Sequence, residues 1–181
     1  MTERLFLGIP FPAETVAALS RQLGHRFPRG LPGRPVPPEN WHITLRFLGE
    51  VEPDARERLL LALDSEGLGR PFELVLDRLG AFPSNSRARV LWLGSGDRQS
   101  AIRELAARVE RRVRQAGFPP DERPFSPHLT LARLREPENL RHAIGGGEGP
   151  RLTLNVTEIA LFRSHLGGPA ARYEVVRSLP L

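Results

Sequence analysis

Two short segments of the chain carry the same pair of reactive side chains, a histidine followed two positions later by a threonine. The first segment contains His42 and Thr44, and the second contains His128 and Thr130. An imidazole accepts or donates a proton near neutral pH, so two of them can serve as the base and the acid of one displacement. Hydroxyl and arginine donors can stabilise the charge that develops on phosphoryl oxygens. The set therefore fits in-line displacement at phosphorus, such as the opening of a cyclic phosphodiester by water.

The two segments are copies of one decapeptide. WHITLRFLGE, at 41–50, and PHLTLARLRE, at 127–136, agree at five of ten positions and are nearly half a chain length apart. The strand and helix pattern around each copy is also similar, which predicts two related halves that each supply one motif. A single histidine on a strand is usually structural, whereas a matched pair indicates function. We interpret His25, His142 and His165, which lack this context, as surface or local structural residues.

Metal binding is the other common role of two histidines. Neither repeat has an aspartate, glutamate or cysteine at ligand spacing, so we expect no metal and no cofactor. The chain contains no cysteine, which excludes disulfides, thiolate zinc sites and a cysteine nucleophile.

The histidines must be held by strands. Residues i and i+2 share one face of a strand, so His42 and Thr44 point together, as do His128 and Thr130. The branched apolar residues between and after them point to the other face, into apolar packing. If the two halves face one another, two imidazoles and two hydroxyls line one cleft.

Hydrophobic patterning and turn residues predict the remaining elements. An α+β fold with antiparallel sheet follows, because strands and helices alternate without a strict parallel-crossover rhythm. Gly117 is placed to end the longest helix, and the proline-rich and glycine-rich stretch 28–39 is mostly loop. No linker is evident, so we expect one domain over 1–181, made of two intimate lobes. We expect strands at 4–9, 41–48, 72–79, 90–93, 127–134, 152–162 and 171–179, helices at 13–23, 53–63 and 98–116, a short helix at 136–144, and a flexible run at 145–149.

The composition is that of a globular protein, with 40% hydrophobic and 26% charged residues among 181. The formal net charge is +5, and all 26 basic residues are arginine, which favours an anionic partner and bidentate phosphate contacts. We find neither a signal-peptide pattern nor an apolar run of membrane-spanning length, so we expect a cytoplasmic protein without membrane attachment.

These motifs resemble those of the 2H phosphoesterase superfamily, and more closely its RNA 2′,3′-cyclic phosphodiesterase branch, the ThpR/LigT-like family. The resemblance extends over nearly the whole chain, in long ordered runs. The matching runs lie at 4–10, 36–49, 79–83, 90–93, 125–133 and 171–175.

The resemblance implies a fold and an activity. The fold would have two pseudo-symmetric lobes, each an antiparallel sheet with outer helices, around a central positively charged cleft. The activity would be metal-independent hydrolysis of an RNA 2′,3′-cyclic phosphate end to a 2′-phosphate, with His42 and His128 as the catalytic pair and Thr44 and Thr130 as phosphate donors. We take His42 as the general acid and His128 as the general base, although the nearly equivalent repeats do not fix that order.

Three further residues are candidates for substrate binding. The family pattern suggests that Arg133, five positions after His128, binds the phosphate. Phe47 at the equivalent position has two open interpretations, a nucleobase platform and a core residue. A regular strand would turn both away from the cleft, and a bulge beyond the threonine would reconcile this. Arg46 has the correct parity to face the cleft as a secondary phosphate contact. For Trp41 we favour packing.

Alternatives remain open at this point. The same residues could catalyse the reverse reaction, which joins RNA ends through a 2′–5′ linkage. The chain could instead be a non-catalytic RNA-binding module, although binding alone does not need two histidine–threonine pairs. A third candidate substrate is a small cyclic nucleotide or an ADP-ribose cyclic phosphate. We expect RNA as the partner and a monomeric protein.

Overall fold

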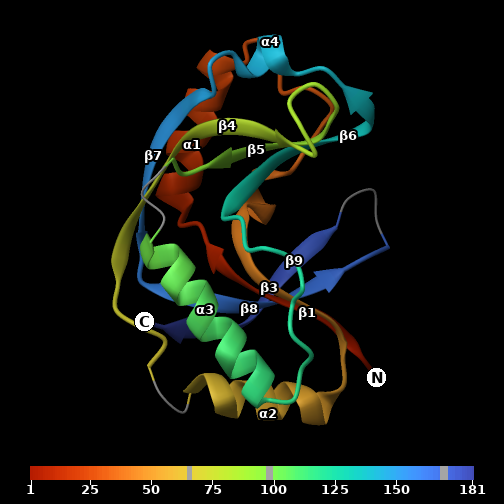
Figure 1. Cartoon of the computed structure of the whole chain (residues 1–181), viewed down its shortest axis with the longest axis vertical. Helices are drawn as coiled ribbons and strands as arrows, with labels where there is room; N and C mark the ends of the chain where they lie inside the picture. Colours follow the sequence, from red (N-terminus) through yellow and green to blue (C-terminus); the bar gives the residue numbers. More distant parts are fainter. Residues whose placement is uncertain (65–66, 97–99, 168–170) are drawn as a thin grey trace.

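The computed structural model describes residues 1–64, 67–96, 100–167 and 171–181. Its strands form one continuous, curled sheet in which every pair is antiparallel and the order is β7-β4-β5-β6-β3-β1-β8-β9, with β2 paired to β6 (Figure 1). The strands are β1 (Glu3–Pro10), β2 (Arg34–Pro35), β3 (His42–Val51), β4 (Phe72–Phe82), β5 (Ala88–Gly94), β6 (His128–Glu138), β7 (Glu148–Val156), β8 (Glu158–His165) and β9 (Arg172–Pro180).

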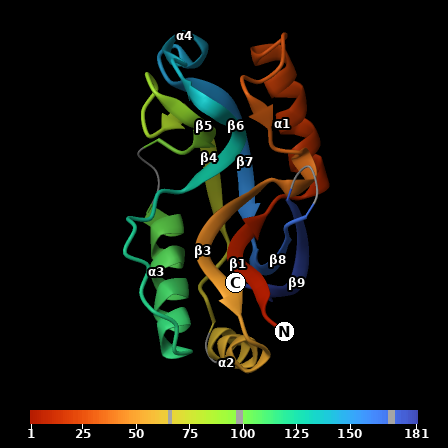
Figure 2. The same ribbon diagram turned by 90° about the vertical axis from the view of Figure 1, so that its right-hand side faces the viewer.

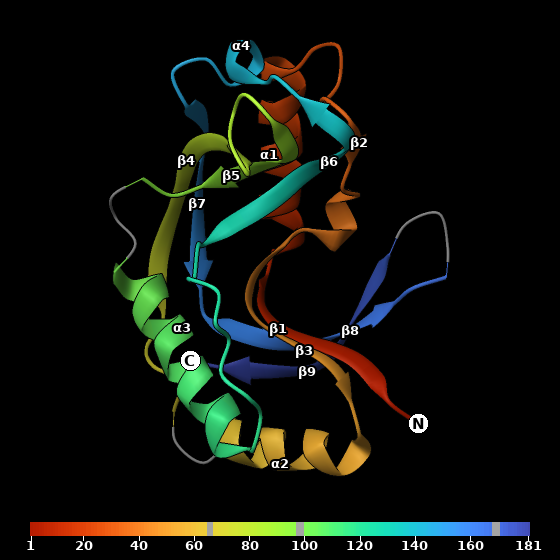
Figure 3. The same cartoon turned by 45° about the vertical axis from the view of Figure 1, so that its right-hand side comes forward.

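The predicted two-lobed α+β fold is confirmed, with one refinement. Strands β3, β1, β8 and β9 form the first lobe, and β6, β5, β4 and β7 form the second. The lobes are joined where β3 pairs with β6 through Ile43 and Leu129, so one sheet continues from lobe to lobe (Figure 3). The two motif strands are therefore direct neighbours at the centre of the molecule.

The helices tie the lobes together. They are α1 (Ala13–Arg26), α2 (Pro53–Asp64), α3 (Ser100–Gln115) and the short α4 (Arg141–Ile144), with a 3-10 turn at Pro38–Asn40. Helix α1 follows β1 of the first lobe but packs on β7 of the second, whereas α3 follows β5 of the second lobe and packs on β3 of the first. Figure 2 shows α1 and α3 on opposite sides of the sheet. Each long helix thus crosses to the other lobe.

Helix α3 shows why the longest predicted helix forms. Ile102, Leu105, Val109 and Val113 recur at helical spacing and are all buried. The helix ends at Gly117, whose φ of +93° favours glycine. The amide of residue 118 donates to the carbonyl of Val113 (3.2 Å) and that of Gly117 to Arg114 (3.0 Å), which together form a Schellman cap.

Two predicted elements are wrong. The segment expected as one strand at 152–162 is two strands, because the chain leaves β7 in the second lobe and enters β8 in the first at Thr157. No glycine or proline marks this crossing. Most of the helix expected at 136–144 is absent, because β6 continues to Glu138, which pairs with Ala88.

Smaller differences concern the ends of elements. Strand β7 already begins at Glu148, within the run expected to be flexible. The expected start of the long helix at 98 lies outside the described residues. The remaining predicted elements occur with ends within a few residues of those expected, and the 28–39 loop includes only the short strand β2 and the start of the 3-10 turn.

Candidate active site

The two motifs meet where β3 and β6 pair. His42 is the first residue of β3 and His128 the first of β6. In an antiparallel pair, the Ile43–Leu129 register sets His42 level with Thr130 and Thr44 level with His128, all on the face opposite those two apolar side chains. The four residues line one cleft of about 660 Å³, called the catalytic cleft below.

His42 is held firmly at both ring nitrogens. Its Nδ1 lies 2.7 Å from the carbonyl oxygen of Asn40, so Nδ1–H donates there and Nε2 carries the lone pair, 3.1 Å from the Thr44 hydroxyl. Three aromatic rings surround the imidazole, at centroid distances of 4.7 Å for Phe6, 5.0 Å for Tyr173 and 5.7 Å for Phe162. These contacts leave the imidazole little freedom to rotate.

The carbonyl that orients His42 is itself anchored. The Asn40 side chain is buried, donates to the carbonyl of Ala171 (2.6 Å) and accepts from the amide of Tyr173 (3.4 Å). The beginning of β9 therefore supports the histidine at the beginning of β3, although the two are far apart in sequence.

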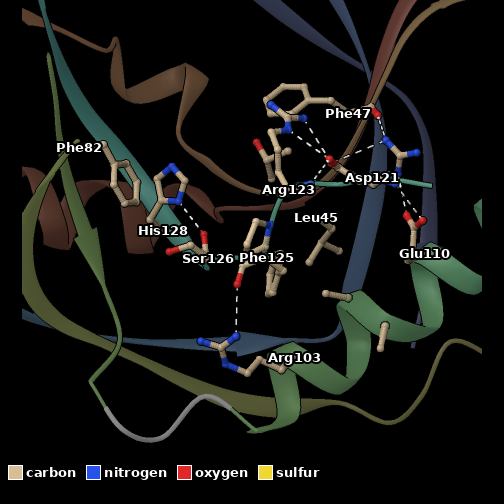
Figure 4. Close-up of a pocket in the computed structure, with 15 residues that line it drawn as sticks. Leu45, Phe47, Phe82, Arg103, Glu110, Asp121, Arg123, Phe125, Ser126 and His128 are labelled. Atoms are coloured by element: carbon tan, nitrogen blue, oxygen red, sulfur yellow. Dashed lines mark hydrogen bonds and ion pairs between the residues drawn. The ribbon is translucent and has the colours of Figure 1, made fainter. Parts of the chain in front are cut away.

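His128 makes the equivalent hydrogen bond to the backbone, and its imidazole is less enclosed by other side chains. Its Nδ1 lies 2.7 Å from the carbonyl oxygen of Ser126, which again leaves Nε2 as the acceptor nitrogen. Phe82 meets the imidazole edge-on at 5.0 Å (Figure 4), and the Trp92 ring lies 5.3 Å from that of Phe82. The indole can approach because residue 80 is glycine: a Cβ there would lie 2.2 Å from the Trp92 ring.

Both imidazoles have lowered proton affinity. Burial, with smaller effects from the nearby His128 and Arg133, lowers the pKa of His42 from its ordinary 6.5 to about 4, against the opposing effect of the hydrogen bond to the Asn40 carbonyl. Burial also lowers the pKa of His128, with Arg133 adding to the effect. Each histidine is therefore neutral in the free protein at pH 7.

The predicted bulge beyond the threonine is confirmed, and it occurs in both repeats. Gly8 and Leu7 of β1 pair with Thr44 and Arg46, so Leu45 is the additional residue in β3. Trp92 and Leu91 of β5 pair with Thr130 and Ala132, so Leu131 is the additional residue in β6. The bulge reverses the alternation of side chains beyond each threonine.

The bulges decide which candidate substrate residues reach the catalytic cleft. Phe47 and Arg133, five residues after each histidine, both line it. Phe47 is about half exposed and packs 5.9 Å from Phe6 rather than in the core.

The prediction that Arg46 faces the catalytic cleft is wrong, because the same bulge turns it away. Its guanidinium is buried beside α3, where Nε donates to Glu110 at 2.7 Å. Its other nitrogens donate to the carbonyls of Phe47 and Pro119, and Asp121 lies 3.7 Å away. Arg46 therefore joins β3 to α3 and to the segment before β6.

Trp41 packs as predicted. It is 6% exposed in the core, and its Nε1 donates to the carbonyl of Val36 (3.1 Å). Sequence reasoning missed the roles of Asn40, Phe82 and Arg123, although all three are near recognised motifs. Their contacts with the cleft depend on β9, on β4 and on the segment before β6.

The described side chains that line the catalytic cleft carry charge of one sign only. Among the described residues its lining holds three arginines, Arg4, Arg123 and Arg133, and no acidic side chain. The part of the chain that the structure describes has no group of three or more histidine, cysteine, aspartate or glutamate side chains able to hold a metal ion. None of its helices is long and apolar enough to cross a membrane.

Comparison with known proteins places this geometry in a family. The family model for LigT like Phosphoesterase matches the chain twice, over residues 9–92 and 93–173, so each match contains one histidine–threonine motif. A crystal structure of E. coli LigT complexed with 3′-AMP superposes with a TM-score of 0.81 at 30% identity, covering 100% of this chain and 99% of that one.

Two curated relatives also match the chain and share one name. A protein of Aeropyrum pernix named RNA 2′,3′-cyclic phosphodiesterase is 41% identical over 111 residues, covering 61% of this chain and 62% of its own. A protein of the same name from Geobacillus stearothermophilus is 33% identical over 184 residues, covering 97% of this chain and 56% of its own. The matches thus span less than two thirds of the length of these two relatives. With the repeated motif and the two-lobed sheet, the double match shows that the chain belongs to the LigT-like phosphoesterase family.

Proposed function

We propose that this protein hydrolyses the 2′,3′-cyclic phosphate at the end of an RNA to a 2′-phosphate, without a metal. The observation that carries the proposal is the set of two imidazoles and two hydroxyls on one face of the β3–β6 pair, in a cleft lined by three arginines. An anionic phosphodiester is attracted to that cleft, where one neutral Nε2 can take a proton from water and the other Nε2, once protonated, can donate to the substrate. The names of the relatives support the same substrate.

The reaction needs one proton removed and one supplied. One histidine takes a proton from water as its oxygen attacks phosphorus, and the bond from phosphorus to the 3′-oxygen breaks. The other histidine protonates that 3′-oxygen, which leaves a 3′-hydroxyl and a 2′-phosphate. Thr44, Thr130 and Arg133 stabilise the charge on the non-bridging oxygens.

The order of the histidines remains our proposal: His42 as acid and His128 as base. In the free protein the lower pKa of His42 favours the opposite protonation, so this order requires the bound phosphate to raise the pKa of His42. A substrate with sulfur in place of the 3′-oxygen tests it, because a thiolate leaves without an acid. We expect this substrate to restore turnover to His42→Ala and not to His128→Ala; the reverse pattern would exchange the two roles.

Phe47 is proposed to stack on the terminal nucleobase. Its half-exposed ring lines the cleft beside Phe6, and the Arg123 guanidinium lies 5.6 Å from its centroid. Stacking on an aromatic ring is tolerant of base identity, so this contact by itself favours no particular terminal base.

Product analysis is the decisive test of the proposed function. An oligoribonucleotide with a defined 2′,3′-cyclic end is incubated with the protein in excess chelator, and the end group is identified by mass spectrometry and phosphatase treatment. We expect a 2′-phosphate. Loss of activity in chelator with rescue by a divalent ion would refute the metal-independent mechanism, and a joined strand would favour ligation. Binding without any product would favour an RNA-binding module.

A further inference from the structure

A second hollow of about 660 Å³ opens beside the catalytic cleft, between β3, α3 and the segment 121–128 (Figure 4). We call it the side pocket. It shares five lining residues with the catalytic cleft, namely Thr44, Phe47, Phe82, Arg123 and His128. His42, Thr130 and Arg133 line only the catalytic cleft. The side pocket therefore adjoins the catalytic cleft on the His128 side, where Phe47 and Arg123 line both hollows.

The wall of the side pocket combines apolar and cationic surface. Leu45, Ala106, Ala107, Pro124 and Phe125 supply apolar surface. Arg103, whose Nη1 donates to the carbonyl of Phe125 at 3.2 Å, brings a positive charge to the same wall. Nucleic acid sites for single strands use the same pairing of apolar and aromatic faces with arginine.

The acidic residues of the side pocket are held by arginines. Glu110 accepts from Arg46 at 2.7 Å, and Asp121 accepts from Arg123 at 3.1 Å. Because Arg46 is buried, water screens the Arg46–Glu110 ion pair less than it screens an exposed pair. The carboxylates thus offer acceptor oxygens for a base amine while their charge is balanced, and the arginines of the lining outnumber the acids.

We propose that the side pocket binds the nucleotide on the 5′ side of the terminal one, so that the protein prefers an RNA end of at least two nucleotides to a cyclic mononucleotide. This inference rests on the proposed function. The catalytic cleft alone is within the size range of a small-molecule site, so the terminal nucleotide leaves the equally large side pocket unfilled. A chain that continues from the terminal 5′-oxygen past Phe47 and Arg123 enters that pocket.

The test compares kcat/KM for a dinucleotide and a mononucleotide that both end in a 2′,3′-cyclic phosphate. One stacked base is worth about 1–3 kcal/mol, a factor of about 5–150, so we expect the unmodified protein to favour the dinucleotide by roughly that factor. Ala107 is exposed on α3 and lines the side pocket. Ala107→Trp fills the pocket and Ala107→Glu adds a repelling charge, and either should bring the ratio close to one.

The matched control is Ala17→Trp, at an exposed position of α1 outside both hollows. It should leave the ratio as in the unmodified protein. Because the readout is a ratio, partial misfolding of a variant cancels. A ratio already near one in the unmodified protein, or one that both Ala107 variants leave unchanged, overturns the inference. Failure of the unmodified protein to hydrolyse either substrate refutes the proposed function, and the inference with it.

Discussion

The surroundings of His42 and of His128 differ although the two motifs share one backbone plan. Both imidazoles direct Nδ1 to the carbonyl two residues earlier, and both strands bulge just after the threonine. His42, however, is surrounded by three aromatic rings and supported by the buried side chain of Asn40. Among the described residues His128 has one aromatic neighbour, Phe82.

The difference shows how two copies of one motif can hold imidazoles of unequal proton affinity. The local backbone orients both imidazoles identically, whereas their burial is set by the lobe around each one. Burial, together with His128 and Arg133, lowers the pKa of His42 to about 4, while the pKa of His128 is lowered by burial and by Arg133. An acid–base pair acts with one imidazole protonated and the other neutral, and unequal pKa values widen the pH interval in which the two imidazoles together carry one proton.

The largest effect is expected from removing either imidazole. His42→Ala and His128→Ala should each lower kcat by about 10²–10⁴-fold, because each deletes one proton-transfer group. The double variant should be little worse than either single one, since the pair acts as a unit. Single-turnover assays on a cyclic-ended oligonucleotide measure this. Full activity in one single variant would show that only one half is catalytic.

Arg133 and Phe47 occupy equivalent positions in the two repeats, and we expect their substitution to change different kinetic constants. Arg133→Ala should lower kcat/KM by about 10²-fold through lost stabilisation of phosphoryl charge. Phe47→Ala should mainly raise KM, by about tenfold, through lost stacking. Arg133 is exposed, so circular dichroism should show an unchanged fold. Equal losses in kcat for both variants would contradict the proposed division of roles.

Asn40 and Ser126, whose carbonyls accept from the two histidines, are expected to contribute differently to the free energy of unfolding. Asn40→Ala removes two buried hydrogen bonds to the start of β9 and should lower the free energy of unfolding by about 1–3 kcal/mol. Ser126 contributes only its backbone carbonyl to His128, so Ser126→Ala is the matched control and should change stability by less than about 0.5 kcal/mol. Urea unfolding measures both, and equal effects would remove the proposed asymmetry.

The pH dependence gives the smallest expected effect. In the free protein the form with one protonated imidazole is most populated above about pH 4 and below 6.5, because both pKa values are lowered. kcat/KM should therefore peak in that interval, falling above it as both imidazoles lose protons and below it as both gain them. Bound phosphate stabilises the imidazolium, so the optimum of kcat should lie at higher pH. Coincident optima above pH 7 would contradict this.

Much of the site follows from local sequence. The repeated decapeptide determines that His42 and Thr44, and likewise His128 and Thr130, share a strand face, because alternation along a strand is a property of the backbone. The same holds for α3, where apolar spacing and Gly117 determine where the helix packs and ends.

Tertiary structure decided the rest. Whether Arg46 or Phe47 reaches the catalytic cleft depends on a bulge whose register is set by pairing with β1, a strand far away in sequence. The crossing at Thr157 depends on which lobe offers each strand a partner. The pKa difference between the two histidines depends on burial by β1, β8 and β9, since desolvation is produced by residues that are close in space and distant along the chain.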